Sequence, residues 1–153
     1  SVENVLIVDL DVHQGDGTAK LAETDRDIFT LSIHGEKNFP HRKQRSDIDI
    51  GLDKGTEDDE YLTTLEQALT MVMRQFQPDA IIYDAGVDVH VNDDLGHLHI
   101  STQGVYERDT QVFALAERLG VPIAAVIGGG YQRDIAALVD AHIQLYRAAG
   151  VID

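Results

Sequence analysis

The chain has 153 residues, with 27 acidic and 12 basic side chains and a formal net charge of -15. This charge argues against direct nucleic-acid binding, because phosphate would be repelled, and favours cationic substrates such as amines or basic peptides. The absence of cysteine excludes disulfides and thiolate metal sites. No apolar run is long enough to cross a membrane and no signal peptide is recognisable, so we expect a cytoplasmic protein.

Four short apolar runs, rich in Val, Ile and Leu, predict strands that are buried on both faces of a sheet. These runs are residues 5–9, 28–33, 80–84 and 123–127, and residues 47–50 predict a minor edge strand. Apolar residues at helical spacing predict helices at about 18–23, 58–77, 101–119 and 133–149. The alternation of strands and helices predicts an α/β fold with a parallel sheet flanked by helices.

Polar motifs follow three of the predicted strands. Residues 9–17 have the sequence DLDVHQGDG, residues 84–88 have DAGVD, and residues 128–131 have GGGY. In parallel sheets, ligands bind beyond the carboxyl ends of the strands, so we expect these motifs to form one shared site. Strand side chains alternate between the two faces of a sheet, so we expect Asp9, Asp11 and His13 to point to the same face.

The residue types in these motifs predict a catalytic metal site. Asp11, His13 and Asp88 would bind one divalent ion and leave positions open for water and a substrate oxygen. Such an ion lowers the pKa of its bound water and polarises a carbonyl group. We expect Tyr131 to donate a hydrogen bond to the oxyanion that develops. Two carboxylates and one imidazole suit zinc, and they also accept iron(II) or other divalent ions.

The three motifs, with the DDLG sequence at residues 93–96, resemble those of the histone deacetylase superfamily. This superfamily includes acetoin-utilisation proteins and acetylpolyamine amidohydrolases. Many members have a second histidine at the position of Gln14, and a glutamine there resembles the small bacterial and class IV-like branch. The resemblance implies an arginase/deacetylase-like fold and zinc-dependent hydrolysis of an N-acyl amide. The implied substrate is an acylated lysine peptide or an acetylated amine.

The resemblance also implies roles for individual residues. Asp11, His13 and Asp88 fall on the zinc ligands of the family, and Tyr131 falls on the tyrosine that polarises the scissile carbonyl. Some members also bind potassium near the metal strand, and the local counterparts here would be Asp9, Asp11, His13 and Ser32.

Further residues fall on positions around the family's zinc site. Asp9 and Asp16 correspond to carboxylates that orient a tandem histidine pair. Phe39 corresponds to an aromatic wall of the substrate tunnel, and Gly129 and Gly130 would line the same tunnel.

The tandem histidine pair itself is absent, since none of the seven histidines is adjacent to another. In the family this pair precedes the zinc strand and manages proton transfer. We therefore interpret residues 1–153 as the carboxyl-terminal part of one deacetylase-like catalytic domain, hence a truncated domain. We expect weak or absent activity from this chain alone, and an exposed sheet edge with apolar surface.

Two alternatives remain open at the level of sequence. The first is a non-catalytic metal-binding or interaction module derived from the same fold, which the missing histidine pair favours. The second is an arginase-type enzyme with two manganese ions, which is disfavoured because Gly15 stands where a bridging carboxylate is needed. The sequence leaves the oligomeric state undetermined.

Overall fold

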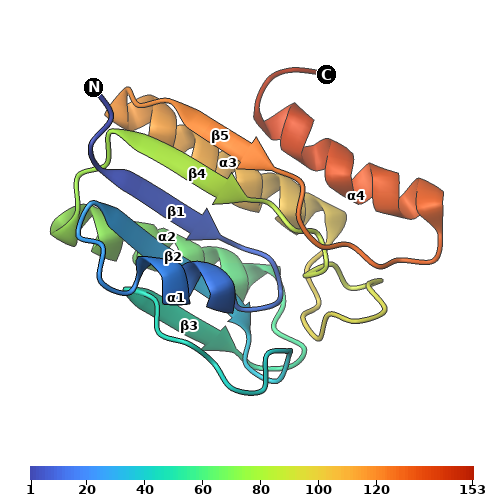
Figure 1. Cartoon of the computed structure of the whole chain (residues 1–153). Coiled ribbons are helices and arrows are strands. Elements are labelled where there is room, and N and C mark those ends of the chain that lie inside the picture. Colours follow the sequence, from blue (N-terminus) through green and yellow to red (C-terminus); the bar gives the residue numbers. More distant parts are fainter.

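The computed structural model describes residues 1–153 and contains one five-stranded parallel sheet (Figure 1). The strand order is β3-β2-β1-β4-β5. The strands are β1 (Val5–Asp9), β2 (Ile28–Gly35), β3 (Ile48–Leu52), β4 (Ala80–Asp84) and β5 (Ile123–Val126). The predicted α/β class and all five predicted strands are therefore confirmed, with shifts of only a few residues at their ends.

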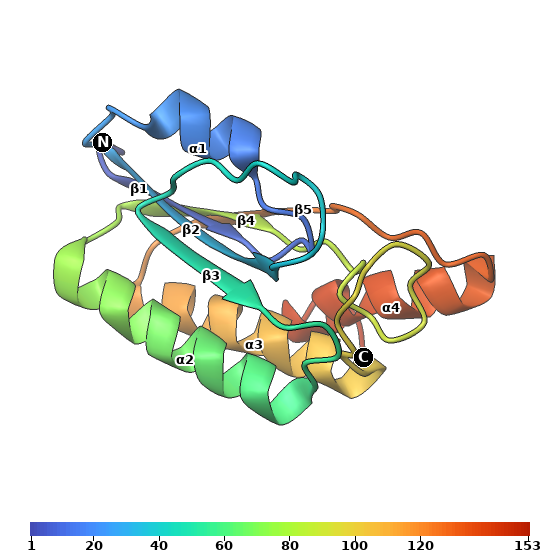
Figure 2. The same ribbon diagram turned by 90° about the horizontal axis from the view of Figure 1, so that it is seen from below.

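Helices cover the two faces of the sheet unequally. In Figure 2, α1 (Asp16–Ala22) lies alone on one face, and α2 (Asp58–Gln75), α3 (Thr102–Leu119) and α4 (Ile135–Ala148) lie on the other side. The core lies between the sheet and this second layer, and one cluster of 26 buried apolar residues runs through it. None of the four helices has both the length and the apolar character needed to span a bilayer.

Local sequence signals account for the helix ends. The Ser101 side chain accepts a hydrogen bond from the Gly104 amide at the start of α3, as expected of an N-cap. Gly120 ends α3 with a positive φ of 67°, a conformation that costs glycine little. Asp134 caps α4 by accepting from the amides of Ala136 and Ala137.

The prediction that the strands are buried on both faces is wrong for β4 and β5 on the face of the sheet that carries α1. Ile82 of β4 is 42% exposed and Val126 of β5 is 47% exposed. The reason is that the seven-residue α1 packs against β2 and leaves β4 and the edge strand β5 uncovered. The expected exposed apolar surface is thereby confirmed on these two strands, whereas an edge exposed by missing strands stays a prediction.

The order of the strands places a switch point between β1 and β4. The chain runs from β1 to β2 and β3 on one side, and then crosses to β4 and β5 on the other. In open parallel sheets, the loops at such a reversal diverge and leave a crevice that binds ligands. The register pairs Asp9 with Asp84 at this point, so the loops carrying the first two motifs leave the sheet side by side.

Candidate metal centre

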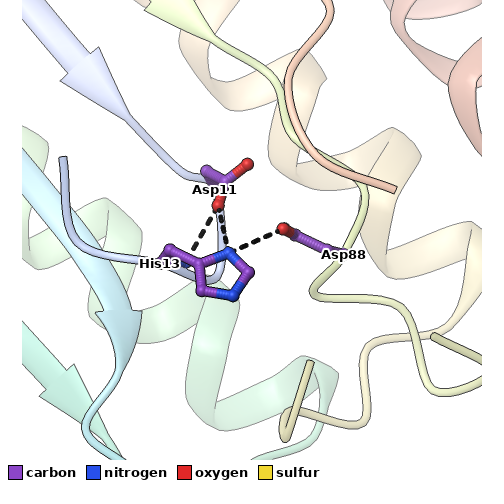
Figure 3. Close-up of side chains that lie close together, drawn as sticks. All are labelled: Asp11, His13 and Asp88. Carbon is purple, nitrogen blue, oxygen red and sulfur yellow. Dashed lines mark hydrogen bonds and ion pairs between the residues drawn. The ribbon is translucent and has the colours of Figure 1, made fainter. Parts of the chain in front are cut away.

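Asp11, His13 and Asp88 converge beyond the ends of β1 and β4, as Figure 3 shows. Their ligand atoms all lie within 4.8 Å of one another. His13 Nδ1 lies 3.0 Å from Asp11 Oδ1 and 3.0 Å from Asp88 Oδ2. The fold therefore brings together the three residues that the sequence predicted as ligands of one metal ion.

A turn, and not strand alternation, brings Asp11 and His13 to the same place. Strand β1 ends at Asp9, so the expectation that all three side chains share one strand face is wrong. Beyond the strand, the Asp9 carboxylate accepts the Asp11 amide at 3.1 Å, and the Asp11 carboxylate accepts the His13 amide at 2.9 Å. These local hydrogen bonds shape the turn that presents both ligands.

Backbone amides from other segments fix the two carboxylates. The Val12 amide donates to Asp88 Oδ1 at 2.8 Å, and the Gly129 amide donates to Asp11 Oδ2 at 2.7 Å. The remaining oxygen of each carboxylate, Asp11 Oδ1 and Asp88 Oδ2, lies 3.0 Å from His13 Nδ1. The Asp88 side chain is fully buried, whereas those of Asp11 and His13 are 16% and 22% exposed. Solvent therefore reaches the site at Asp11 and His13 but not at Asp88.

Glycine is required where the third motif meets the carboxylates. A Cβ atom on Gly129 would lie 2.1 Å from Asp88 Oδ2 and 2.6 Å from Asp11 Oδ2. A Cβ atom on Gly86 would lie 2.4 Å from Asp11 Oδ2 and 2.9 Å from the Asp11 Cα. Any other residue at these two positions would displace a ligand, which explains the glycines in the second and third motifs.

The carboxylates and the imidazole change one another's proton affinity. Hydrogen bonds to Asp11 and then to Asp88 raise the pKa of His13 to about 10. Burial raises the pKa of Asp88 to about 6. Burial also acts on Asp11, but hydrogen bonds from His13 outweigh it and lower the pKa of that carboxyl. At neutral pH, a protonated imidazole therefore lies between two carboxylates.

This arrangement fits a divalent ion. The two oxygens that face His13 Nδ1 belong to carboxylates, so the middle of the trio favours positive charge. One imidazole and two carboxylates form a donor set typical of zinc and iron(II) sites with open positions. Asp11, His13 and Asp88 would hold such an ion once the His13 proton is displaced.

Tyr131 lies next to the trio, on the segment between β5 and α4. Its ring is edge-on to the His13 ring, with 6.2 Å between the centroids, and its side chain is substantially exposed. Partial burial and the negative charges of Asp88 and Asp11 raise the pKa of Tyr131. The phenol therefore keeps its proton at neutral pH and can donate a hydrogen bond near the trio.

The other predicted residues occupy different surroundings. Asp9 is buried in the turn after β1, where burial and then the charges of Asp84 and Asp11 raise its pKa to about 8. Asp16 is the first residue of α1, and its carboxylate accepts the amide of the next residue, Gly17, at 3.0 Å. Asp9 therefore supports the turn that carries the ligands, whereas Asp16 makes no hydrogen bond to the trio.

Phe39 lies at the surface, on the loop that follows β2. It is 64% exposed, and its ring is edge-on to that of His41 at 6.4 Å. The neighbouring Asn38 donates to the Leu95 carbonyl at 2.9 Å, which ties this loop to the segment that follows Asp88. Phe39 thus lies on a loop joined to the rim of the site, but it does not contact the trio.

Gly130 and Ser32 lie in close-packed surroundings. A Cβ atom on Gly130 would lie 2.8 Å from side-chain atoms of Leu138 and Val87, so this glycine packs against α4. The Ser32 hydroxyl is buried and hydrogen-bonded with His34 Nδ1 at 2.9 Å. The tunnel and potassium roles of these residues stay predictions.

Two residues support the site in ways that the sequence did not predict. Asp93 accepts the Tyr131 amide at 2.7 Å, and Arg108 of α3 donates to backbone carbonyls beside the ligands. A signal for Arg108 was available, because it shares the helix face of the apolar residues Val105 and Val112. Asp93 is the first residue of the DDLG motif at residues 93–96, which was recognised as a motif but given no role.

Comparisons with known proteins identify the family of this chain. Residues 1–146 match the histone deacetylase domain family. An uncharacterized protein of Picosynechococcus sp. is 50% identical over 147 residues, which cover 96% of this chain and 49% of that protein. Histone deacetylase 2 of Arabidopsis thaliana is 34% identical over 154 residues, which cover 99% of this chain and 40% of that protein.

The fold agrees as well. The solved structure of acetylpolyamine aminohydrolase from Burkholderia pseudomallei matches with a TM-score of 0.80 at 23% identity, over 97% of this chain and 45% of that one. This chain thus spans about half the length, or less, of the relatives that it matches. The motifs, the parallel sheet and the match over residues 1–146 together make this chain a member of the histone deacetylase family.

Proposed function

We propose that the protein is a metal-dependent amidohydrolase that removes an acetyl or other acyl group from an N-acylated lysine or amine. The carrying observation is the convergence of Asp11, His13 and Asp88 at the switch point of the sheet, with Tyr131 beside them. The names of the relatives, a histone deacetylase and an acetylpolyamine aminohydrolase, support this reaction class. We further propose that residues 1–153 form the carboxyl-terminal part of one catalytic domain, since the relatives are about twice as long.

Asp11, His13 and Asp88 would hold zinc, and the same donor set would accept iron(II). Such an ion, when bound, activates a water molecule and polarises the substrate carbonyl. The protein's own contribution is to keep the three donors fixed. The amides of Val12 and Gly129 donate to Asp88 Oδ1 and Asp11 Oδ2, which holds both carboxylates in the orientation in which they would bind the ion.

Tyr131 would act on the substrate carbonyl. Its phenol keeps its proton at neutral pH, because partial burial and the nearby carboxylates raise its pKa. A neutral hydrogen-bond donor beside His13 would stabilise the negative charge that develops on the carbonyl oxygen. The strongly acidic composition, with a net charge of -15, favours amine-containing or basic substrates over acidic ones.

Proton transfer is the step that this chain supports least. Once His13 is a ligand, no second imidazole forms part of the hydrogen-bonded site, and the chain contains no adjacent histidines. We therefore expect low turnover from the 153-residue chain alone. The same observation favours a second candidate function, a metal-binding or interaction module without catalytic activity.

Hydrolysis of an acetyl-lysine peptide and of an N-acetylated polyamine tests the proposal. The 153-residue chain and the whole protein of which it is part should be assayed beside Asp88→Ala and Tyr131→Phe, with the metal content of each measured directly. We expect turnover by the whole protein, loss of metal and activity in Asp88→Ala, and loss of activity with retained metal in Tyr131→Phe. Metal binding without turnover by the whole protein would favour the non-catalytic module.

A further inference from the structure

Arg108 of α3 is a fully buried arginine whose guanidinium group contacts the backbone beside the metal ligands. Its Nη1 donates to the Gly86 carbonyl at 2.6 Å and to the Leu10 carbonyl at 3.3 Å, and its Nη2 donates to the Ala85 carbonyl at 3.3 Å. Leu10 directly precedes Asp11, and Gly86 stands two residues before Asp88. One guanidinium group therefore bridges the two turns that carry the metal ligands.

A buried ion pair holds this guanidinium in place. Asp109 is fully buried, and its Oδ1 accepts from Arg108 Nε at 2.9 Å and lies 2.9 Å from Nη2. The hydroxyl of Tyr83, on the adjacent strand β4, donates a short hydrogen bond to the same Asp109 oxygen. Arg108 is thus fixed from the helix side and the strand side before it reaches the two turns.

Packing of α3 against the sheet does not require this charge. Val105 and Val112 occupy the same face of the helix and fill the interface with apolar atoms alone. A buried ion pair contributes little net stability compared with apolar residues of similar size, because both charges lose their hydration. What the guanidinium adds is direction, since its planar fork donates in fixed directions to carbonyls in the two turns that follow β1 and β4.

We infer that Arg108 is a positioning residue that sets the spacing between Asp11 and Asp88, an inference that rests on the proposed metal-dependent function. A lysine at this position keeps the charge but loses the fork, so it cannot hold both turns in the same geometry. Arg108→Lys should therefore weaken metal binding in a protein that is still folded. Substitutions around metal ligands typically reduce metal affinity by about 10- to 100-fold, and we expect a loss in this range.

The test compares Arg108→Lys with Val112→Ala, a substitution on the same buried helix face at a residue whose apolar side chain makes no hydrogen bond to either turn. Zinc affinity is measured by competition with a chelator, and the visible spectrum of the Co²⁺-substituted protein reports the ligand geometry. We expect Arg108→Lys to bind zinc at least about 10-fold more weakly, with an altered cobalt spectrum. Val112→Ala should lower the melting temperature but leave both metal readouts unchanged. Unchanged zinc affinity and cobalt spectrum in folded Arg108→Lys would overturn the inference.

Two further variants keep the outcome unambiguous. If Arg108→Lys does not fold, Tyr83→Phe is used in its place, since it removes only the hydroxyl that holds Asp109. We expect zinc affinity to fall by about threefold in Tyr83→Phe. Unchanged zinc affinity would refute the inference. Asp88→Ala separates this inference from the proposed function. If Asp88→Ala loses zinc while Arg108→Lys and Tyr83→Phe do not, the metal site stands and the role of Arg108 falls. If Asp88→Ala binds zinc as the wild type does, the metal site falls and Arg108 has no ligands to position.

Discussion

The amide of Val12 donates a 2.8 Å hydrogen bond to Oδ1 of Asp88, 76 positions further along the chain. Val12 lies between the two ligands of the first turn, so this bond fixes the second ligand-bearing turn against the first. It also leaves Oδ2 of Asp88 directed at His13. The orientation of the third ligand is therefore set by the backbone between the other two.

Replacing Gly129 with alanine should damage the metal site without unfolding the protein. The new methyl group would lie 2.1 Å from Asp88 Oδ2, and it would force one ligand out of place. We expect zinc affinity to fall by about 10-fold or more in a chelator competition assay. Gly17→Ala is the matched control, because its Cβ meets nothing within 4 Å, and it should bind zinc as the wild type does. Equal affinities in the two variants would contradict this account of the glycine.

Metal affinity should rise with pH. Hydrogen bonds to Asp11 and Asp88 raise the pKa of His13 to about 10, so metal binding at neutral pH must displace one proton. We expect the zinc association constant to increase about 10-fold per pH unit between about pH 7 and 9, and more steeply near pH 6, where Asp88 also binds a proton. Chelator competition at several pH values measures this slope. Calorimetry in buffers of different ionisation enthalpy counts the released proton, and a flat profile would show that His13 is already neutral.

Asp9→Asn should stabilise the metal-free protein at alkaline pH. Burial, with the charges of Asp84 and Asp11, raises the pKa of Asp9 from 3.8 to about 8. The folded state then holds a proton that the unfolded state releases above about pH 4, so this contribution to stability is lost as the pH rises towards 8. Asparagine avoids that loss and can still accept the Asp11 amide.

The melting temperatures of Asp9→Asn and the wild type, compared at pH 5 and pH 8 in potassium-free buffer that contains a chelator, check this prediction. Asp9→Asn should melt about 4 °C or more above the wild type at pH 8, with a smaller difference at pH 5. A difference of the same size at both pH values would mean that the Asp9 charge is not responsible.

Asp93→Asn should impair turnover by the whole protein while leaving its metal affinity unchanged. Asp93 Oδ2 accepts the Tyr131 amide at 2.7 Å, and Oδ1 accepts the amides of Leu95 and Gly96 at 2.9 Å and 2.8 Å. An asparagine presents an NH2 group to one of these two sets of donors, so the segment carrying Tyr131 loses its anchor. We expect kcat to fall by about 10-fold or more, because misplaced catalytic groups are costly. A parallel loss of zinc would place Asp93 in support of the metal site instead.

The sequence was sufficient to predict most of the architecture and the composition of the site. Uninterrupted apolar runs and capping residues such as Ser101 located the strands and helices to within a few residues. The motif residues Asp11, His13 and Asp88 were identified because they follow strands whose carboxyl ends must share one edge of the sheet.

What the sequence did not predict depends on contacts between distant segments. The exposure of Ile82 and Val126 follows from how little of the far face α1 covers, which apolar runs alone do not encode. The bridging role of Arg108 depends on the depth at which α3 packs, and the anchoring role of Asp93 depends on where the Tyr131 segment returns. Composition and periodicity report local preferences, whereas these roles are fixed only by tertiary packing.

The bond between the Gly129 amide and Asp11 spans 118 positions, more than three quarters of the chain. The trio of Asp11, His13 and Asp88 therefore reaches its final geometry only after β1, β4 and the segment beyond β5 have all packed together. A ligand that binds there stabilises the finished fold and not an early intermediate. Metal binding would therefore depend on completed folding, because a chain in which β5 has not packed against β4 lacks the hydrogen bond from the Gly129 amide to Asp11.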